Sequence, residues 1–207
     1  DYLHNRIIKR SFDVIFSSLV IVGILSWLTP LLWILYKIFL PGPLFFTQER
    51  IGKNNKTFKC FKFRTIKKEH CNHDYKPVSN GKEERINCFG RLLRKTNIDE
   101  LPQFINVFLG HMSIVGPRAH AISFQEKYRE FVDNISVRQL VKPGITGWAQ
   151  VNGYRGDLPD EEENKKWIKK RIEHDIWYIE NWSFLLDLKI IGKTVLQMIT
   201  FRVPNAY

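Results

Sequence analysis

The segment Val14–Tyr36, VIFSSLVIVGILSWLTPLLWILY, holds no charged residue and is bounded by Asp13 and Lys37. It is longer than the roughly 20 apolar residues that a helix needs to cross the hydrocarbon core of a bilayer. A cleaved signal peptide fits poorly, because its apolar core is shorter and no small-residue cleavage site follows Tyr36. The segment therefore predicts a membrane anchor, with a buried helix of a soluble domain as the alternative.

Two features of this segment predict that it does not simply cross the bilayer. Pro30 lacks a backbone N–H and its ring clashes with the preceding turn, so a kink or break is expected at Thr29–Pro30. Basic residues flank both ends, with Lys9 and Arg10 before the segment and Lys37 after it. Since basic flanks favour the cytoplasmic side, we predict a re-entrant helix that breaks at Pro30 and returns. A kinked ordinary span is the alternative.

The composition favours one catalytic domain with anionic partners. The chain has 207 residues, and 32 Lys and Arg against 21 Asp and Glu give a net charge of +11. This charge suits phosphorylated substrates, nucleic acid or an acidic leaflet. Cys60, Cys71 and Cys88 are irregularly spaced and predict no disulfide framework. Zinc at the run His70–His73, HCNH, is disfavoured because the spacing matches no standard site.

The residues after the anchor predict a mainly helical α+β domain. Polar and aromatic residues alternate from Thr57 to Arg64 and, with a short strand over Leu44–Thr47, predict a β-hairpin. Residues 70–85 lack periodicity and predict a surface loop, as do Lys142–Gly147 and Asn152–Gly156. Helices are predicted over Phe89–Arg94, Leu101–Leu109, Ala119–Asp133 and Asp160–Asn181, the second burying Leu101, Phe104, Ile105 and Phe108.

A further helix is predicted near the C-terminus, where apolar residues share one helical face and two tryptophans precede them. It fits an amphipathic helix in the headgroup plane, and equally one packed on the core. We therefore expect a re-entrant anchor over residues 1–40 and a cytosolic domain over 41–207 that ends in an interfacial helix. The apolar residues are Phe184, Leu188, Ile191, Val195 and Ile199, and the tryptophans are Trp177 and Trp182.

Asp99 and Glu100 are the adjacent acids in the basic run RKTNIDELPQ, residues 94–103. One interpretation is structural, because Asn97 followed by Glu100 resembles a helix cap and acids stabilise a first helical turn. The other is catalytic. Neighbouring helical side chains point about 100° apart, so one carboxylate could attack phosphorus while the other holds a metal. Nearby cations could bind a pyrophosphate, and Mg²⁺ suits carboxylate and phosphate oxygens.

Other cations are weaker candidates when each is taken alone. Lys62, Arg64 and Arg118 lie in aromatic or Pro-Gly contexts, where a solvated surface position is the alternative. The sequence holds no Walker loop and no GxGxxG motif, which argues against a P-loop nucleotidase and dinucleotide binding.

Taken together, these segments resemble the bacterial sugar transferase family, the monotopic phosphoglycosyl transferases that begin glycan assembly on polyprenyl phosphate. The resemblance covers nearly the whole chain. Its motifs are Lys9–Asp13, Pro41–Phe46, Gln48–Gly52, Phe61–Thr65, Leu92–Lys95, Asp99–Gln103, Asn106–Val107, Met112–Arg118, Lys142–Gly147 and Asp175–Asp187.

The resemblance implies a covalent mechanism. Asp99 would attack the β-phosphate of a UDP-sugar and release UMP, and polyprenyl phosphate would then take the phosphosugar from its carboxylate. Glu100 would hold Mg²⁺. The substrate-binding residues would be Lys62, Arg64, Arg94, Gln103, Arg118 and Arg155.

Trp148–Gly156 and the residues after Arg118 look most like members that transfer glucose 1-phosphate at the start of capsule or exopolysaccharide synthesis. Galactose 1-phosphate transfer and a membrane-tethered anion-binding module are the alternatives. Ala119 stands where proline is usual, which predicts a less rigid loop at Arg118. Such members often carry a preceding multispan region, so residues before Asp1 are one expectation.

The resemblance also implies partners and a location. The expected partners are UDP-sugar, polyprenyl (undecaprenyl) phosphate and the lipid bilayer. Downstream glycosyltransferases and a second copy in a homodimer are further expected partners, and nucleic acid is not expected. The expected location is the bacterial inner membrane, with the catalytic domain facing the cytoplasm.

Overall fold

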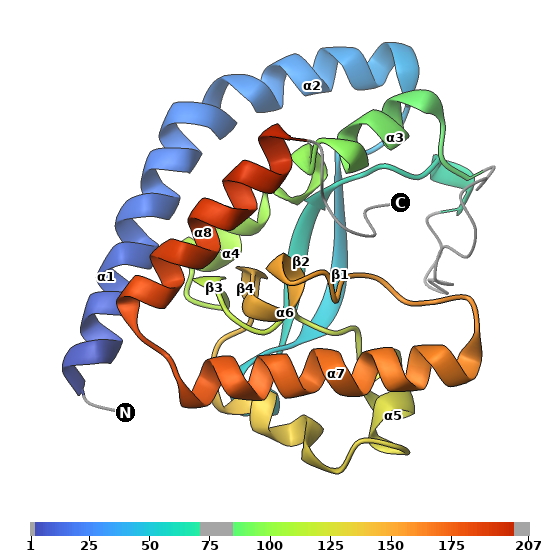
Figure 1. Ribbon diagram of the computed structural model, residues 1–207. Coiled ribbons are helices and arrows are strands. Elements are labelled where there is room, and N and C mark those ends of the chain that lie inside the picture. The colour runs from blue at the N-terminus through green and yellow to red at the C-terminus, as the bar shows by residue number, and fades with distance from the viewer. Residues whose placement is uncertain (1–2, 71–84, 201–207) are drawn as a thin grey trace.

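The computed structural model describes residues 3–70 and 85–200. A long bent helix at the N-terminus lies along one side of the domain formed by the rest of the chain (Figure 1). It comprises α1 (Leu3–Val20), the π-helical turn η1 (Ile21–Leu25) and α2 (Ser26–Phe39). The stretch is long and apolar enough to cross a membrane, and only 17% of its most apolar window is buried. Such exposure is unlike the core helix of a soluble protein.

Pro30 lies inside α2, so the helix continues through the residue at which a break is expected. The irregular turn lies upstream, where the Ser26 N–H donates to the Ile21 carbonyl in the π-helical pattern. A π turn holds an extra residue and is a usual place for a helix to bend. The bend between α1 and α2 in Figure 1 lies at this turn.

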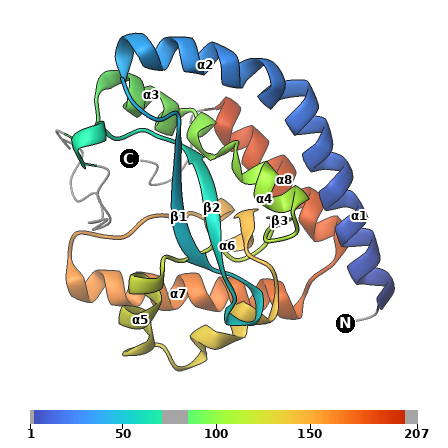
Figure 2. The same ribbon diagram turned by 180° about the vertical axis from the view of Figure 1, so that it is seen from behind.

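The predicted hairpin is confirmed and stands at the centre of the domain (Figure 2). Strand β1 (Phe45–Ile51) pairs antiparallel with β2 (Thr57–Phe63), so that Phe45 lies opposite Phe63. Asn54 and Asn55 form the turn with φ of 55° and 61°, a backbone region that asparagine adopts more readily than most residues.

The predicted buried face next to helix α4 (Gln103–Phe108) is confirmed in part, because Leu101, Phe104 and Ile105 pack half-buried against the core while Phe108 does not. Gln103, Asn106 and Val107 are buried, whereas Phe108 is 46% exposed. Asn106 is buried because its side chain takes the place of a strand partner: it accepts a hydrogen bond from Phe61 N at 2.9 Å and donates one to Lys59 O at 2.7 Å. These bonds satisfy backbone groups of β2 and hold a polar side chain inside the domain.

The segment Lys142–Gly147 is not wholly a loop, because β4 (Gly144–Thr146) pairs in parallel with β3 (Ser113–Val115). The two chains approach closely at glycines. A Cβ on Gly144 would lie 2.1 Å from the nitrogen of Gly116. Glycine is therefore required there by space, and three-residue strands carry too little alternation to be recognised.

The remaining helices surround these two sheets. The predicted helix at residues 119–133 is shorter than expected, and residues 71–84 of the predicted loop lie outside the described residues. The elements are α3 (Cys88–Lys95), α5 (Ile122–Arg129), α6 (Trp148–Val151), α7 (Glu161–Glu180) and α8 (Phe184–Ile199), with 3-10 turns at Lys53–Asn55, Lys68–His70, Ile98–Glu100 and Asp133–Leu140.

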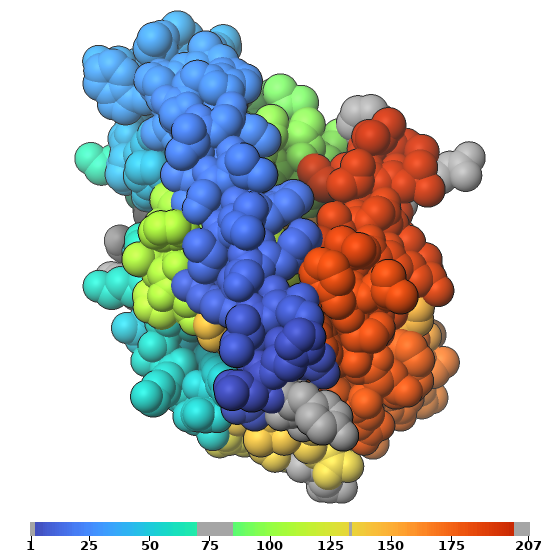
Figure 3. Space-filling model, turned by 90° about the vertical axis from the view of Figure 1, so that its left-hand side faces the viewer, coloured from blue at the N-terminus to red at the C-terminus, as the bar shows by residue number. Residues whose placement is uncertain are grey.

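Helix α8 lies beside α1 along one face of the molecule (Figure 3). Ile190 is fully buried, while Leu185, Val195 and Ile199 are 76%, 49% and 70% exposed. The helix thus has a packed side and an exposed apolar side. Together with α1, α8 gives this face of the molecule an unusual amount of uncovered apolar surface.

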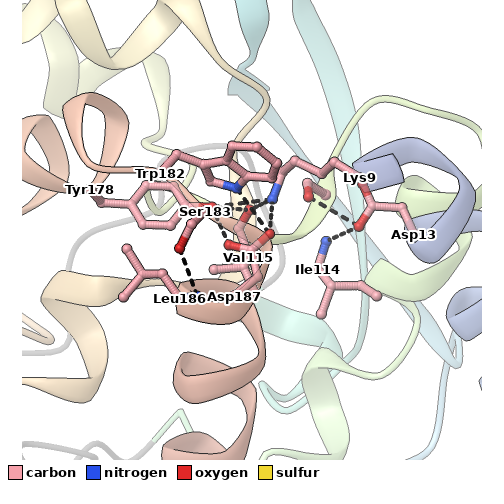
Figure 4. A network of polar contacts seen from close by, with 10 residues as sticks. Lys9, Asp13, Ile114, Val115, Tyr178, Trp182, Ser183, Leu186 and Asp187 are labelled. Atoms are coloured by element: carbon pink, nitrogen blue, oxygen red, sulfur yellow. Dashed lines mark hydrogen bonds and ion pairs between the residues drawn. The ribbon is translucent and has the colours of Figure 1, made fainter. Parts of the chain in front are cut away.

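A buried polar network fastens the start of α1 to the domain (Figure 4). Lys9 Nζ lies 2.5 Å from Asp187 Oδ2, and it donates to the Val115 carbonyl at 3.0 Å. Asp187 also accepts from Tyr178 and Trp182. One turn further along α1, the carboxylate of Asp13 accepts from the backbone N–H of Ile114 and the hydroxyl of Ser113.

The end of α2 is fastened to the same domain by Arg64, which is 1% exposed. Its guanidinium donates to the carbonyls of Leu40, Pro41, Pro43 and Ile66, and its own carbonyl accepts from Tyr36. Four charge-assisted hydrogen bonds to backbone oxygens explain why a buried arginine has no carboxylate partner here. Both ends of the apolar helix are thus held by one folded body.

Candidate active site

Asp99 and Glu100 lie in a tight turn between α3 and α4. Asn97 adopts a left-handed backbone with φ of 54°, and a 3-10 turn over Ile98–Glu100 then leads toward α4. The Asn97 side chain caps no helix and instead accepts a hydrogen bond from Arg155 Nη2 at 2.6 Å. The capping interpretation of this run is therefore wrong, and the turn instead buries both carboxylates.

Glu100 is surrounded by three cations from three parts of the chain. Its Oε1 accepts from Lys62 Nζ in β2 and from Arg118 Nη2 after β3, each at 2.8 Å. Its Oε2 lies 3.9 Å from Arg155 Nη2. Burial acts to raise the pKa of Glu100, but Arg118, Lys62 and Arg155 together hold it well below its usual value. Glu100 is therefore ionised throughout the physiological range.

Asp99, the residue directly before Glu100, is not held by neighbouring cations in this way. The described residues give its carboxylate no hydrogen bond and no ion pair within 4 Å. Burial raises the pKa of Asp99 from 3.8 to about 6, with Lys62 opposing the rise and Glu100 adding to it. At pH 7 about nine tenths of Asp99 is ionised. It is then a poorly solvated carboxylate with both oxygens available, which are the properties of a nucleophile.

The pocket that holds Asp99, here called the acid pocket, lies between the hairpin and α3. Its walls are polar and carry several cations, which suits a ligand with negative charge. The lining residues are Phe46, Gln48, Arg50, Lys62, Phe63, Arg64, Thr65, Ile66, Arg94, Asn97, Asp99, Glu100 and Arg155.

The sequence-predicted substrate residues fall into two groups. Lys62 and Arg155 line the acid pocket, as does Arg94, whose Nε donates to Thr65 Oγ1 at 2.9 Å. Arg118 reaches Glu100 at its edge. Arg64 lies in the wall with its guanidinium bound to backbone carbonyls, and Gln103 is buried in α4 and does not line the pocket.

Sequence reasoning assigned no role to a buried ion pair behind Arg118. Arg138 Nε donates to Asp175 Oδ2 at 2.8 Å, its Nη1 contacts His120 Nδ1 at 2.9 Å, and its Nη2 donates to the Arg118 carbonyl at 2.8 Å. Arg50 similarly donates to the carbonyl of residue 119 at 2.7 Å. Two arginines therefore fix the loop that was expected to lack rigidity without a proline.

His120 is neutral in this network. Burial, followed by the charge of Arg138, lowers the pKa of His120 well below its usual value. A neutral imidazole can accept at Nδ1, which fits its 2.9 Å contact with an arginine donor. Asp175 was part of the family motif, but no spacing rule could have paired it with Arg138 across 37 residues.

An apolar groove adjoins the acid pocket and shares Asn97, Glu100 and Arg155 with it. It has a volume of about 250 Å³ and lies between α1, α4 and α8. Its apolar lining includes Phe16, Val20, Leu101, Phe104, Ile114, Ile145, Val151, Ile191, Val195 and Met198. The apolar groove thus borders a carboxylate and a guanidinium that also line the acid pocket.

No cluster of three or more His, Cys, Asp or Glu side chains occurs within residues 3–70 and 85–200. Mg²⁺ needs fewer protein ligands when substrate phosphates complete its shell. Glu100 Oε2 accepts no hydrogen bond from the described residues, and Asp99 has both oxygens available. Hard carboxylate oxygens beside a cation-rich pocket therefore fit a magnesium–diphosphate complex better than an all-protein metal site.

The acid pocket thus combines an uncommitted buried carboxylate with several cations, beside an apolar groove and an exposed apolar helix, the combination expected of an enzyme that acts on phosphorylated substrates at a membrane. The chain belongs to the bacterial sugar transferase family, whose model matches residues 4–201. The resemblance inferred from the sequence is thereby confirmed.

Curated relatives cover the same region. The chain is 41% identical over 191 residues to the UDP-glucose:undecaprenyl-phosphate glucose-1-phosphate transferase of Escherichia coli K12, covering 92% of this chain but only 40% of that protein. It is 41% identical over 199 residues to the exopolysaccharide production protein PSS of Rhizobium leguminosarum bv. phaseoli, covering 95% and 97%. An Aeromonas hydrophila UDP-N-acetylgalactosamine-undecaprenyl-phosphate N-acetylgalactosaminephosphotransferase is 37% identical over 93% of this chain and 44% of that protein.

Proposed function

We propose that this chain transfers a hexose 1-phosphate, preferably glucose 1-phosphate, from a UDP-sugar to undecaprenyl phosphate through a phosphosugar bound covalently to Asp99. The reaction would be the first membrane step of capsule or exopolysaccharide synthesis. The names of the relatives support the substrates. The observation that carries the mechanism is the contrast between Glu100, held by three cations, and Asp99, which no donor among the described residues contacts.

The first displacement forms a bond between a carboxylate oxygen of Asp99 and the β-phosphorus of the UDP-sugar. The bond between that phosphorus and the bridging oxygen breaks, and UMP leaves with the electron pair. In the second displacement a phosphate oxygen of undecaprenyl phosphate attacks the same phosphorus. The acyl-phosphate bond breaks, Asp99 returns as a carboxylate, and the product is an undecaprenyl diphosphate sugar. Two easier steps replace one direct transfer.

The cations of the acid pocket stabilise charge on the phosphates. Arg94, Lys62 and Arg155 line the pocket with Asp99, and Arg118 pairs with Glu100. Positioned cations in a site with little water stabilise a developing phosphorane charge by several kcal/mol. Arg138 and Asp175 act through Arg118 and are positioning residues.

We assign Mg²⁺ binding to Glu100, with the diphosphate of the donor substrate completing the shell. The bound ion would polarise the phosphoryl oxygens and neutralise charge on the departing UMP. Glu100 suits this role because its low pKa keeps it ionised and because Oε2 is not held by a hydrogen bond among the described residues.

The apolar groove is the proposed site for the polyprenyl chain. Its position between α1, α4 and α8 would let isoprene units lie against apolar side chains while the phosphate reaches Arg155. Arg155 lines both the groove and the acid pocket, so the acceptor would meet the phosphosugar where the two cavities join.

A re-entrant anchor with the domain on the cytoplasmic side of the inner membrane accounts for the way both ends of the apolar helix are held. Lys9 and Asp13 tie its start, and Arg64 ties its end, to one folded body. A helix that crossed the bilayer would separate those ends by about 30 Å of hydrocarbon. In the proposed arrangement the bend at Ile21–Leu25 would return the chain to the same side.

Other donor sugars are alternatives to glucose. The Aeromonas relative is named for N-acetylgalactosamine, so related pockets accept more than one hexose. Galactose 1-phosphate transfer is the second candidate from the sequence motifs. An anion-binding module without catalysis would explain the charge, but it gives no reason for an uncommitted buried aspartate.

The covalent step is tested by intact-protein mass measurement after incubation with single UDP-sugars and Mg²⁺. We expect a hexose-phosphate adduct on the wild-type chain with UMP in equal amount, and no adduct on Asp99→Asn. Asp160→Asn, which keeps a side-chain acceptor at the cap of α7, is the control and should label normally. UMP released only when undecaprenyl phosphate is added, with no adduct, would refute the covalent intermediate.

The topology is tested with single cysteines at His4 and Lys56, which are both exposed and lie on either side of the uncharged segment Val14–Tyr36. The background carries serine at Cys60, Cys71 and Cys88. In inside-out vesicles both positions should react with an impermeant maleimide, and in right-side-out vesicles neither should. Reactivity from opposite sides would contradict the re-entrant anchor and support a kinked span.

A further inference from the structure

A second cavity lies away from the acid pocket, among the first turns of α1, the hairpin tip and the Lys142 loop. It is here called the basic pocket. Its walls include five cations and two aromatic rings, Tyr178 and Trp182. The cations are Arg6, Lys9, Arg10, Lys53 and Lys142.

Three of these cations have no carboxylate partner among residues 3–70 and 85–200. Arg10 donates to the carbonyls of Val107 and Phe108 at 2.7 and 2.8 Å, which leaves its charge uncompensated. Lys53 and Lys142 are half-buried and form no ion pair within the described chain. Three cations on the walls of one cavity, with no carboxylate paired to them among the described residues, create a local field that attracts an anion.

Two of the cations, Arg10 and Lys142, lie close together beside Gly110. An added Cβ on this residue would lie 3.4 Å from Arg10 Nη2 and 3.4 Å from Lys142 Nζ. Gly110 has φ of 85°, a conformation that disfavours other residues and keeps the space beside it open. Burial, then the charges of Arg10 and Lys53, lower the pKa of Lys142, and Asp13 opposes them.

The other charged groups on the pocket walls are already committed. Lys9 forms an ion pair with Asp187, and the Asp13 carboxylate accepts from Ser113 and Ile114 (Figure 4). Neither forms an ion pair with Arg10, Lys53 or Lys142, although the Asp13 charge acts on Lys142 from further away.

The pocket also borders the exposed apolar surface. Leu3 and Ile7 on the first turns of α1 are 74% and 58% exposed, and Leu185 at the start of α8 is 76% exposed. Figure 3 shows these two helix ends next to each other. If this surface meets a bilayer, the pocket lies at the depth of the lipid phosphates. The aromatic wall at Trp182 suits the same depth.

We propose that Arg10, Lys53 and Lys142 form a phosphate-binding site, distinct from the acid pocket, that holds the headgroup phosphate of an anionic bilayer lipid. A phosphodiester oxygen between Arg10 and Lys142 would neutralise the trio and fix the orientation of α1 at the membrane surface. A soluble phosphate ester presents the same chemistry, and the test separates the two sources.

The test uses the full chain in neutral detergent micelles and native mass spectrometry with phosphatidylglycerol or phosphatidylcholine. We expect one saturable phosphatidylglycerol adduct on the wild-type chain and at least tenfold weaker binding in Lys53→Gln/Lys142→Gln. The control Lys56→Gln/Lys127→Gln removes the same charge from two exposed lysines outside the pocket and should bind as the wild type does.

Titration with sn-glycerol 3-phosphate separates the sources. Binding of this soluble ester as tightly as phosphatidylglycerol would support the phosphate site but assign it to a soluble ligand, overturning the lipid assignment. Equal phosphatidylglycerol binding by both double variants, or equal loss in both, would overturn the site itself. A thermal melt checks folding, and Lys53→Gln alone replaces the double variant if that chain does not fold.

Discussion

Replacing Asp99 with asparagine should stabilise the protein while abolishing transfer. The folded state binds the Asp99 proton more tightly than the unfolded chain, because burial raises the pKa of Asp99 from 3.8 to about 6. Above pH 6 the charged carboxylate therefore reduces folding stability. At about 1.4 kcal/mol per pH unit between the two pKa values, the reduction is about 3 kcal/mol.

Asparagine has nearly the same shape and no charge, so the variant should recover much of this free energy at pH 8. For a chain of about 200 residues, a gain of about 1–3 kcal/mol raises the melting temperature by roughly 3–10 °C. As pH falls through 6 toward 4, Asp99 of the wild type becomes protonated and the difference should disappear. Thermal unfolding in one detergent at pH 8 and pH 4.5 measures both effects.

Asp187→Asn is a matched control with the same chemical change. Asp187 accepts from Lys9, Tyr178 and Trp182, so its replacement should lower the melting temperature. An Asp99→Asn variant that is less stable than the wild type at pH 8, or equally stabilised at both pH values, would falsify the assignment of an unfavourable buried charge to Asp99.

Three further outcomes follow from the site. The rate of UMP release should fall as Asp99 protonates, to roughly one tenth of its plateau at pH 5, and a flat profile from pH 5 to 7 would contradict this. Arg138→Met should lower the free energy of unfolding by about 3–5 kcal/mol, because Asp175 loses its buried partner. Urea denaturation measures this change, and a loss under about 1 kcal/mol would mean that the ion pair is dispensable. Val195→Trp should partly fill the apolar groove and raise the KM for undecaprenyl phosphate on the order of tenfold, equivalent to about 1.4 kcal/mol. The burst of UMP from the first displacement should stay unchanged. A slower burst would mean that the groove takes part in the first displacement instead.

The sequence predicted those elements whose structure depends on residues close together in the chain. Alternation from Thr57 to Arg64 identified the hairpin, and Asp160 correctly marked the start of α7, where its side chain caps the Glu163 N–H. The burial of Asn106 in α4 could not be predicted in this way. It depends on hydrogen bonds from Asn106 to the backbone of β2, between residues 45 and 47 positions apart.

The candidate site shows the same division. Asp99, Glu100 and Lys62 were found because acids in a basic run and a family motif both mark them, and the structure brings them together. The purpose of Arg64 could not be predicted, since a guanidinium bound to four carbonyls leaves no charge pattern in the sequence. Arg138 was missed because its partner Asp175 is distant along the chain.

The ion pair between Lys9 and Asp187 also sets an order of events during synthesis. The two residues are 178 positions apart, and a ribosome adding about 5–20 residues per second needs about 10 to 35 s between them. The apolar helix therefore leaves the ribosome long before its last fastening exists. Throughout that interval Lys9 lacks its partner Asp187, and a nascent chain stalled before α8 would hold the helix without this ion pair, through contacts such as those of Arg64 and Asp13.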